Sequence, residues 1–191
     1  MRAVVCEAWC GPEVLTVEDV APPKLKAGGV RIRVHTAGLN FADNLIIAGR
    51  YQIKPPLPFS PGFEVAGRVL ECADGVMRCK PGDRVMAVLD YGGFAEEVVA
   101  DQESVFVLAD SVGDEVAAAF PVAYGTSHLG LRYKCALEPG ESVLVHGAAG
   151  GVGLTAVEIA KRLGATVIAT ASGADKLAVA AAAGADHTLD S

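Results

Sequence analysis

The feature of this sequence that most constrains its fold is a glycine-rich turn between an apolar segment and a helix-forming segment. The segment Val143–His146 is apolar and typical of a strand, the turn Gly147–Gly153 reads Gly-Ala-Ala-Gly-Gly-Val-Gly, and the residues Leu154–Leu163 favour a helix. A side chain at Gly150 or Gly151 would keep phosphate oxygens away from the backbone N–H groups at the start of that helix. The turn therefore predicts a site for the pyrophosphate of a dinucleotide.

The surroundings of this turn favour a cofactor site over a purely structural turn. Three glycines alone are weak evidence, but these follow one apolar strand and precede a helix and a second apolar strand that begins after Gly164. Gly153 would let the helix pack closely on its strand. The cofactor-binding residues predicted in the turn are Ala148, Ala149, Gly150, Gly151, Val152 and Gly153.

The end of the second strand indicates which dinucleotide is bound. An NAD site usually has an acidic residue there, about 20 residues past the glycines, which binds the ribose hydroxyls. In this chain the strand Val167–Ala171 is followed by Ser-Gly-Ala-Asp-Lys, so its end is neutral. Ser172 can donate a hydrogen bond to a 2′-phosphate, and Lys176 supplies a cation one helical turn later. The pattern predicts NADP rather than NAD; the alternative is an N-cap serine followed by an exposed lysine.

The first 120 residues have the pattern of a β-rich domain, with short strand-like segments between glycine- and proline-containing turns and no long helical period. In one segment Val30, Ile32 and Val34 alternate with polar residues, among them His35, which is predicted to lie on the surface. Such spacing favours a barrel or a sandwich. Further strands are predicted at Phe63–Leu70, Arg84–Leu89, Phe94–Val99 and Val105–Leu108.

The sequence changes character after Asp110, where the segments Asp114–Ala119 and Tyr124–Leu137 favour helices. We therefore place a domain boundary near residue 120, with a first domain of residues 1–120 and a second of residues 121–191. The second domain is predicted to contain two βα units, at 142–163 and 166–183, and a third strand at 186–189.

The predicted fold class is α/β, with a β-rich N-terminal domain followed by the first half of a doubly wound parallel sheet. A complete dinucleotide-binding fold of this kind uses six strands. The missing half would need roughly 80 residues, at about 30 for each βαβ unit. We therefore expect the chain to be a fragment of a longer protein; an exposed sheet edge covered in some other way is the alternative.

Composition excludes several classes of protein. The chain has 191 residues, of which 51% are apolar, so it can bury a sizeable core. A net charge of −7 argues against a nucleic-acid partner, because binding to a phosphate backbone requires a basic surface. There is no apolar run of about 18 residues and no secretory pattern at Met1–Val5, so we expect a cytoplasmic protein that does not span a membrane.

The cysteines do not indicate a disulfide framework or a structural zinc site. The five are scattered as Cys6, Cys10, Cys72, Cys79 and Cys135, and no Cys-x2-Cys pair occurs. An odd number without regular spacing predicts reduced thiols. A four-thiolate zinc lobe would have too few ligands.

Beyond the glycine turn, several motifs carry a resemblance to a known family. The chain is similar along its whole length to the medium-chain dehydrogenase/reductase superfamily and, within it, resembles the zinc-independent quinone oxidoreductases. The similar segments are Ala37–Asp43, Pro61–Gly67, Pro81–Val85, Gly92–Glu96 and Leu144–Gly153. The resemblance implies a catalytic domain with a GroES-like β-barrel, followed by a Rossmann domain and a return to the first domain. It also implies a chain longer than this one and a homodimer.

The resemblance also bears on zinc. Zinc-containing members of the superfamily have a cysteine near the position of Asn40, and a histidine where this chain has Phe63 before Glu64. Phenylalanine cannot coordinate a metal, and Asp43 with Glu64 would be a poor zinc set without imidazole or thiolate partners. We therefore expect no metal at this site, with core packing as the role of Phe63.

Without a metal, the expected chemistry is hydride transfer from NADPH to a conjugated acceptor. Quinones and enones spread the incoming charge onto an oxygen that a few hydrogen bonds can stabilise. By resemblance, Asn40 and Tyr51 line the substrate and nicotinamide face, and Thr126 lies near the nicotinamide carboxamide. Tyr51 is alternatively a loop aromatic, and the sequence around Thr126 departs from the family pattern. His128 and His146 are interpreted as structural residues, and no proton donor is assigned.

Two other functions stay open at this point. An enoyl or acryloyl thioester reductase shares the same scaffold and differs in the shape of its substrate pocket. A truncated, non-catalytic module that binds a nucleotide or a partner is the alternative from a different class. The leading prediction is an NADPH-dependent reductase of a small-molecule quinone or enone.

Overall fold

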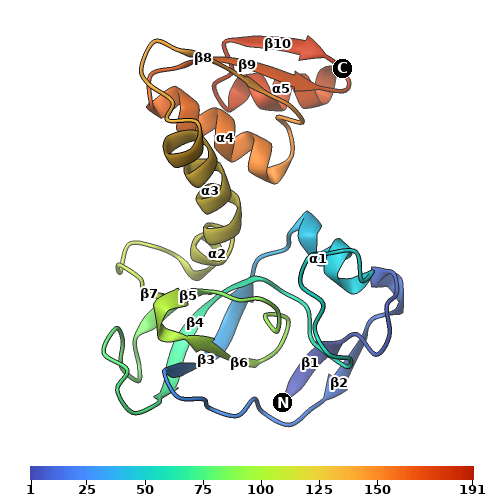
Figure 1. Ribbon diagram of the computed structural model, residues 1–191, viewed down its shortest axis with the longest axis vertical. Helices are drawn as coiled ribbons and strands as arrows, with labels where there is room; N and C mark the ends of the chain where they lie inside the picture. The colour runs from blue at the N-terminus through green and yellow to red at the C-terminus, as the bar shows by residue number, and fades with distance from the viewer. The chain divides into compact units, whose positions relative to one another are not determined.

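The computed structural model describes residues 1–191, and its internal contacts divide the chain into two units, Met1–Val122 and Ala123–Ser191. Strands dominate the first unit, and alternating strands and helices make up the second (Figure 1). The predicted α/β fold class, a β-rich domain followed by half of a doubly wound parallel sheet, is confirmed.

The core of the first unit is a five-stranded antiparallel sheet in the order β6-β3-β4-β5-β7, accompanied by a two-stranded sheet of β1 and β2. Alternate residues of β3 point into the core, and Val30 and Ile32 are fully buried, as the alternation predicts. The strands are β1 (Arg2–Val5), β2 (Thr16–Asp19), β3 (Gly29–Ala37), β4 (Glu64–Cys72), β5 (Arg84–Val88), β6 (Glu97–Asp101) and β7 (Val105–Val107).

The predicted strand at Phe94–Val99 begins later than the sequence indicates, because β6 starts only at Glu97. The residues before it pair with β1 instead of with the large sheet. The N–H of Val4 donates to the carbonyl of Phe94 at 2.8 Å, and the N–H of Glu96 donates to the carbonyl of Arg2 at 3.0 Å. The segment therefore pairs with β1 up to Glu96 and with β3 from Glu97 onward.

A bulge interrupts the pairing of β3 with β4. Val34 pairs with Gly67 and Thr36 pairs with Ala66, so His35 is an additional residue between two consecutive pairs. Bulges of this kind bend a strand and change the direction of the side chains that follow it. The side chain of His35 is 39% exposed, which confirms its predicted surface position.

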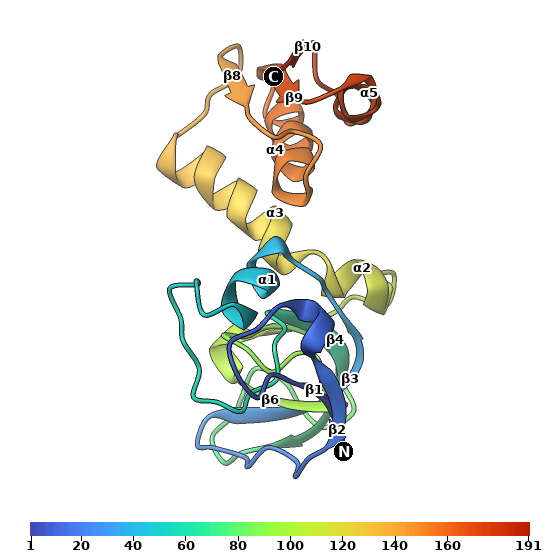
Figure 2. The same ribbon diagram turned by 90° about the vertical axis from the view of Figure 1, so that its right-hand side faces the viewer.

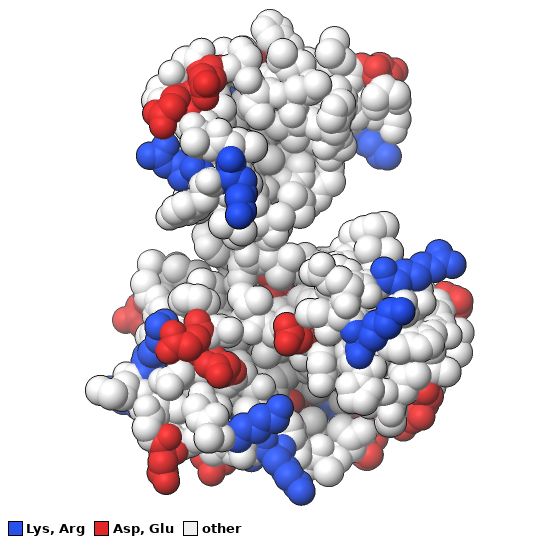
Figure 3. All heavy atoms as spheres, in the orientation of Figure 1, with Lys and Arg blue, Asp and Glu red and all other residues white.

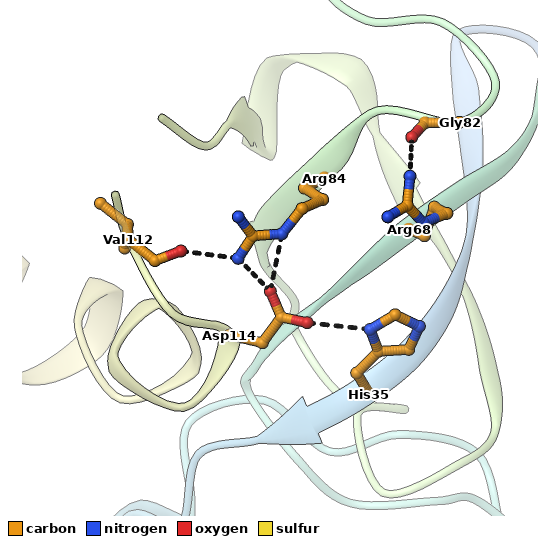
Figure 4. A network of polar contacts seen from close by, with 6 residues as sticks. All are labelled: His35, Arg68, Gly82, Arg84, Val112 and Asp114. Carbon is orange, nitrogen blue, oxygen red and sulfur yellow. Dashed lines mark hydrogen bonds and ion pairs between the residues drawn. The ribbon is translucent and has the colours of Figure 1, made fainter. Parts of the chain in front are cut away.

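His35 takes part in a polar network that attaches α2 (Asp114–Ala118) to the sheet (Figure 4). Asp114 accepts hydrogen bonds from Arg84 at 2.6 Å and lies 2.8 Å from the ring Nδ1 of His35. Arg84 also donates to the carbonyl of Val112 at 2.6 Å. The bond from Arg84, and after it the contact with His35, lowers the pKa of the Asp114 carboxyl. Figure 2 shows α2 beside β3 and β4, the strands on which it packs.

A second helix of the first unit, α1 (Phe41–Ile47), lies in a region where we predicted no helix. The Asp43 carboxylate accepts the backbone N–H of Asn40 at 2.7 Å, which satisfies one of the unpaired donors at the helix start. Ile46 and Ile47 are buried against Phe59 and other apolar residues. The remaining helical segments of this unit are the 3₁₀ turns η1 (Pro12–Val14) and η2 (Gln102–Ser104).

The second unit has three parallel strands in the order β10-β9-β8. Both crossovers step in the same direction, so right-handed connections place α4 and α5 on one face of the strands, as Figure 1 shows. A cluster that includes Val157, Val167 and Ala180, each 0% exposed, fills the space between them. The elements are α3 (Pro121–His128), η3 (Leu129–Lys134), β8 (Ser142–Val145), α4 (Gly151–Arg162), β9 (Thr166–Ala171), α5 (Ala174–Ala182) and β10 (His187–Asp190).

The helix predicted at Tyr124–Leu137 starts earlier and ends earlier than expected. It begins as α3 at Pro121 and continues as the π-helical segment η3, in which the N–H of Cys135 donates to the carbonyl of Gly130. The helix ends there because Ala136 adopts a left-handed conformation, with φ of 51°. Leu137, at the end of this turn, is buried in the core of the second unit.

The five cysteines are free thiols. Burial raises the pKa of Cys6, and separately that of Cys79, to about 11, so both are protonated near neutral pH. No helix in the structure has the length and apolar character needed to cross a membrane. On the face drawn in Figure 3, acidic and basic side chains are interspersed among uncharged ones.

Candidate functional site

The glycine turn forms the N-terminus of α4. Gly150 is the N-cap residue, and the N–H groups of Gly151, Val152 and Gly153 have no partner within the chain. A Cβ atom at Gly153 would lie 2.4 Å from the carbonyl oxygen of Gly147 and 2.7 Å from the Cα of Ala148. The helix start therefore packs directly on the backbone that leaves β8, at a distance that only glycine allows.

Gly150 and Gly151 differ from Gly153 in what surrounds them. A Cβ at Gly151 would meet no atom within 4 Å, and one at Gly150 would meet only the carbonyl oxygen of Gly147, at 3.4 Å. The protein itself does not require glycine at these two positions. A bound group that approaches the free N–H groups closely would require it, and this is the fit expected of a pyrophosphate.

The two alanines of the turn, Ala148 and Ala149, differ from each other in their surroundings. Ala148 is 0% exposed, and its N–H donates to the carbonyl of Thr170 at 2.9 Å, so this residue supports the turn and offers no free amide. Ala149 is half-buried and lines the adjoining cavity.

That cavity, of about 290 Å³, joins the glycine turn to the end of β9. Ser172 and Lys176, the two residues predicted to bind a 2′-phosphate, line it together with the turn. Asp190 of β10 accepts the N–H of Gly173 at 3.0 Å and so holds the β9–α5 connection. The residues that line the cavity are Gly147, Ala149, Gly150, Ala171, Ser172, Lys176 and Ser191. The structure thus brings together predicted residues that lie more than 20 positions apart.

Thr126 lies on α3 in the second unit, and its side chain is exposed. Two residues, one on either side of Thr126, bond α3 to α4. Ser127 donates to the carbonyl of Val152 at 2.8 Å, and Tyr124 donates to Glu158 at 2.6 Å. His128 contacts the ring of Tyr133, whereas His146 bonds to Thr170.

In the first unit, Asn40 is fixed by two buried carboxyl groups. Its side-chain Nδ2 donates to Oε1 of Glu64 at 2.8 Å, and its backbone N–H donates to Asp43 at 2.7 Å. Glu64 is 1% exposed, and its second oxygen accepts the N–H of Val122 at 2.8 Å. Asp43 is 4% exposed, and its Oδ1 has no hydrogen-bond partner. Three chain segments therefore meet at Glu64.

Burial dominates the electrostatics of these carboxyl groups. It raises the pKa of Glu64, while the bonds from Val122 and Asn40 act in the opposite direction. Burial also raises the pKa of Asp43, with the nearby charge of Glu64 adding to the effect. Removal of a carboxylate from water disfavours its charged form, which accounts for both directions.

Gly38 makes room for this arrangement. A Cβ there would lie 2.4 Å from Oε1 of Glu64 and 2.5 Å from the carbonyl oxygen of Ala118. The N–H of Gly38 donates to the backbone carbonyl of Glu64 at 3.1 Å. The segment leading to Asn40 therefore lies directly against the start of β4.

Tyr51 contacts the residue that precedes Glu64. Its ring packs edge-on against Phe63, with 5.2 Å between the ring centroids. Phe63 is 7% exposed and belongs to an apolar cluster with Ile46 and Phe59, so it packs in the core. No group of three or more His, Cys, Asp or Glu side chains in the structure could hold a metal ion.

A larger cavity, of about 750 Å³, also lies in the first unit. It is lined by residues from β1, β6 and the segments around Phe59 and Tyr91, and none of the predicted site residues contributes to it. The predicted site residues therefore do not line this cavity.

The bonds from Asn40 to Glu64 and Asp43 were not predicted; these two acids were considered only as a poor set of zinc ligands. For Asp43 a signal exists, since an acid three residues after Asn40 and just before the apolar Leu45–Ile47 is typical of a helix start. For Glu64 no local signal exists, because its partners lie 24 and 58 positions away.

Two protein families match the chain. The family described as "Alcohol dehydrogenase GroES-like domain" matches residues 26–110, and the family described as "Zinc-binding dehydrogenase" matches residues 151–191. The first match falls within the β-rich unit, and the second begins at the first residue of α4.

Relatives of known description are similar over most of this chain. "Quinone oxidoreductase-like protein 2" of Rattus norvegicus is 42% identical over 175 residues, which are 92% of this chain and 49% of the relative. "Quinone oxidoreductase" of Homo sapiens is 40% identical over 173 residues, which are 90% of this chain and 53% of the relative. The chain thus spans about half the length of the curated relatives it matches.

Solved structures show the same similarity. A quinone oxidoreductase from Pseudomonas syringae pv. Tomato DC3000 is 39% identical with a TM-score of 0.95, and the match covers 99% of this chain and 58% of that one. The Escherichia coli quinone oxidoreductase complexed with NADPH is 33% identical with a TM-score of 0.94, over 100% of this chain and 58% of that one.

Proposed function

This chain belongs to the medium-chain dehydrogenase/reductase superfamily and, within it, to the quinone oxidoreductases, and we propose that it functions as an NADPH-dependent oxidoreductase. The proposed reaction is the reduction of quinones or related conjugated enones by hydride transfer without zinc. Phe63, in the core where zinc enzymes have a ligand, supports the proposed independence from zinc.

The observation that carries the proposal is the cavity of about 290 Å³ that joins the glycine turn to Ser172 and Lys176. The free N–H groups of Gly151, Val152 and Gly153 would hold the pyrophosphate at the helix N-terminus. The Ser172 hydroxyl and the Lys176 ammonium would hold the 2′-phosphate that distinguishes NADPH from NADH. Similarity to a structure solved with NADPH supports the same choice.

When bound, the nicotinamide cofactor supplies the hydride. The residues of this chain would then orient the cofactor and the acceptor and stabilise the charge that develops on the acceptor oxygen. Asn40 would donate to the acceptor oxygen through the N–H of Nδ2 that does not bond to Glu64. Tyr51 would form an aromatic wall beside the acceptor, and Thr126 would hydrogen-bond the nicotinamide carboxamide. A conjugated acceptor suits such a site, because its developing charge is spread over the molecule before hydrogen bonds stabilise it.

Charge reversal at Lys176 tests the cofactor assignment. In Lys176→Glu we expect the affinity for NADPH to fall by roughly ten- to a hundredfold and that for NADH to stay nearly unchanged, because a charge-assisted hydrogen bond contributes about 1.5–3 kcal/mol. Fluorescence titration of both cofactors measures this. Lys134→Glu, an exposed lysine of the same unit outside the cavity, is the matched control. Equal losses for NADPH and NADH would contradict the assignment.

Turnover tests the acceptor. With NADPH, we expect oxidation in the presence of a benzoquinone and little with a crotonyl thioester. The reverse preference would indicate an enoyl thioester reductase of the same superfamily. Binding without turnover of either compound would indicate a non-catalytic module.

A homodimer, a cytoplasmic location and the lack of a nucleic-acid partner stay predictions.

A further inference from the structure

Asn40 is a half-buried residue between two exposed ones, and two buried acids bond to it. The neighbouring side chains Leu39 and Phe41 are 84% and 78% exposed, so this segment runs along the outside of the unit. Between them, Asn40 bonds through its side chain to the buried Glu64 and through its backbone to the buried Asp43. Two buried acids thus restrain one half-buried position that lies between two exposed side chains.

The chemistry of Glu64 determines which way the Asn40 amide faces. An ionised carboxylate only accepts hydrogen bonds, and here Oε1 and Oε2 accept from Asn40 Nδ2 and from the backbone N–H of Val122, both at 2.8 Å. The amide nitrogen of Asn40 must therefore face Glu64. One N–H of Nδ2 is then used by Glu64, and the second N–H, which points in a different direction, is left to donate to an acceptor oxygen.

We propose that Glu64 is a positioning residue, which fixes the side chain of Asn40 in a single orientation toward the substrate by accepting its amide N–H. This inference rests on the proposed function, which places Asn40 against the acceptor. The backbone N–H of Val122 cannot turn away, so it anchors the carboxylate while the other oxygen orients Asn40. Asp43 completes the arrangement, since it fixes the backbone from which the Asn40 side chain extends.

The variant Glu64→Gln tests orientation with little change of volume. A carboxamide has one accepting oxygen and one donating NH2 group, so it cannot accept from both Asn40 and Val122. The backbone donor keeps the oxygen, and the NH2 group of the substituted side chain then faces Asn40. The Asn40 amide is expected to reverse or to lose its bond.

Asparagine-specific labelling makes this reversal directly observable. The sequence contains two asparagines, Asn40 and Asn44, and Asn44 is exposed on α1. In a spectrum of the ¹⁵N-asparagine-labelled chain, we expect the Asn40 NH2 protons to exchange with water at least tenfold more slowly than those of Asn44. In Glu64→Gln the Asn40 signals should shift and exchange faster, whereas those of Asn44 should not change.

The wild-type spectrum alone can overturn the proposal, so the test does not depend on the folding of a variant. Exchange at Asn40 as fast as at Asn44 would refute it, as would an Asn40 signal that does not respond to Glu64→Gln. Neither measurement needs cofactor or turnover. These measurements therefore test the orientation of Asn40 even if the proposed function is wrong.

A double-mutant cycle then tests the link to substrate in the active protein. We expect Glu64→Gln to lower kcat by roughly tenfold with an unchanged Kd for NADPH, and to cause no further loss once Asn40 is replaced by alanine. Independent, multiplying losses would show a structural role for Glu64 and overturn the proposal. An unchanged kcat in Asn40→Ala would instead overturn the proposed role of Asn40 itself.

Discussion

The two candidate sites of this chain are built from different kinds of atoms. In the second unit, the glycine turn offers backbone N–H groups from consecutive residues at the start of α4. In the first unit, Asn40 is held by the side chains of Asp43 and Glu64, and the latter is also bonded to Val122. A site made of backbone depends on local sterics, whereas a site made of buried side chains depends on contacts between distant segments.

The buried acids near Asn40 also differ from Asp186 of the second unit in the direction of their pKa shifts. In the first unit, burial raises the pKa of Asp43 and of Glu64, because removal from water disfavours the charged form of a carboxyl group. In the second, the hydrogen bond from Lys161 lowers the pKa of Asp186, which favours its charged form. The direction of each shift therefore follows from the dominant surroundings of the carboxyl group, which are burial for Asp43 and Glu64 and a bonded cation for Asp186.

The largest expected effect is on the first unit. Glu64→Ala removes a buried acceptor from two donors, Asn40 Nδ2 and the Val122 N–H, and leaves a cavity. We expect a loss of about 3 kcal/mol in the free energy of unfolding. Urea unfolding followed by the fluorescence of Trp9, the single tryptophan, reports on this unit. A loss below about 1 kcal/mol would show that the carboxylate contributes little to the fold.

The glycines of the turn provide the next test, in the second unit. Gly153→Ala would place a Cβ 2.4 Å from the carbonyl oxygen of Gly147, and we expect destabilisation by about 2 kcal/mol. The matched control, Gly151→Ala, has open space around its Cβ and should leave stability nearly unchanged while it weakens cofactor binding. Circular dichroism during unfolding and a cofactor titration separate the two effects. Equal loss of stability in both variants would contradict the distinction.

A smaller effect is expected where the acid is paired near the surface. Asp114→Asn breaks the ion pair with Arg84 at 2.6 Å and should cost about 1 kcal/mol near neutral pH. Because the folded state lowers the pKa of Asp114, this stabilisation is present above the unfolded value of about 3.9 and is lost as pH falls through the folded value. Unfolding of both proteins at pH 7 and pH 3 should show the difference disappearing in acid.

The smallest effect concerns Asp43, and its sign is opposite. Since burial raises its folded pKa, its contribution is fully present below about pH 3.9 and is lost as pH rises through the folded value. Asp43→Asn should therefore flatten the decline of the urea midpoint between pH 4 and pH 7. Asp74→Asn, at an exposed position of the same unit, is the control. A steeper decline in Asp43→Asn would contradict the burial argument.

The sequence was sufficient to predict the second unit in some detail. A strand, a glycine turn and a helix succeed one another directly, and the sterics of glycine act within a few residues, so the positions of β8 and α4 followed from local pattern. The grouping of Ser172 and Lys176 with the turn was also predicted, because neighbouring parallel strands end at the same edge of a sheet.

The first unit was less predictable for a physical reason. Its strands were recognised from alternation, but α1 is only seven residues long and is stabilised by Asp43 and by burial rather than by a helical period. The role of Glu64 depends on a contact with Val122, 58 positions away, and no local pattern encodes it. The late start of β6 likewise results from pairing with β1, which only the folded chain reveals.

The bulge at His35 has a consequence for how this site tolerates insertions and deletions. Because one extra residue separates the Val34–Gly67 pair from the Thr36–Ala66 pair, it sets the phase of every following residue up to Asn40. Deleting that single histidine would leave the composition of the strand almost intact. It would, however, shift each residue after the bulge by one position relative to β4 and place a different side chain next to Glu64. Length at this point is therefore as much a determinant of the Asn40 site as residue identity.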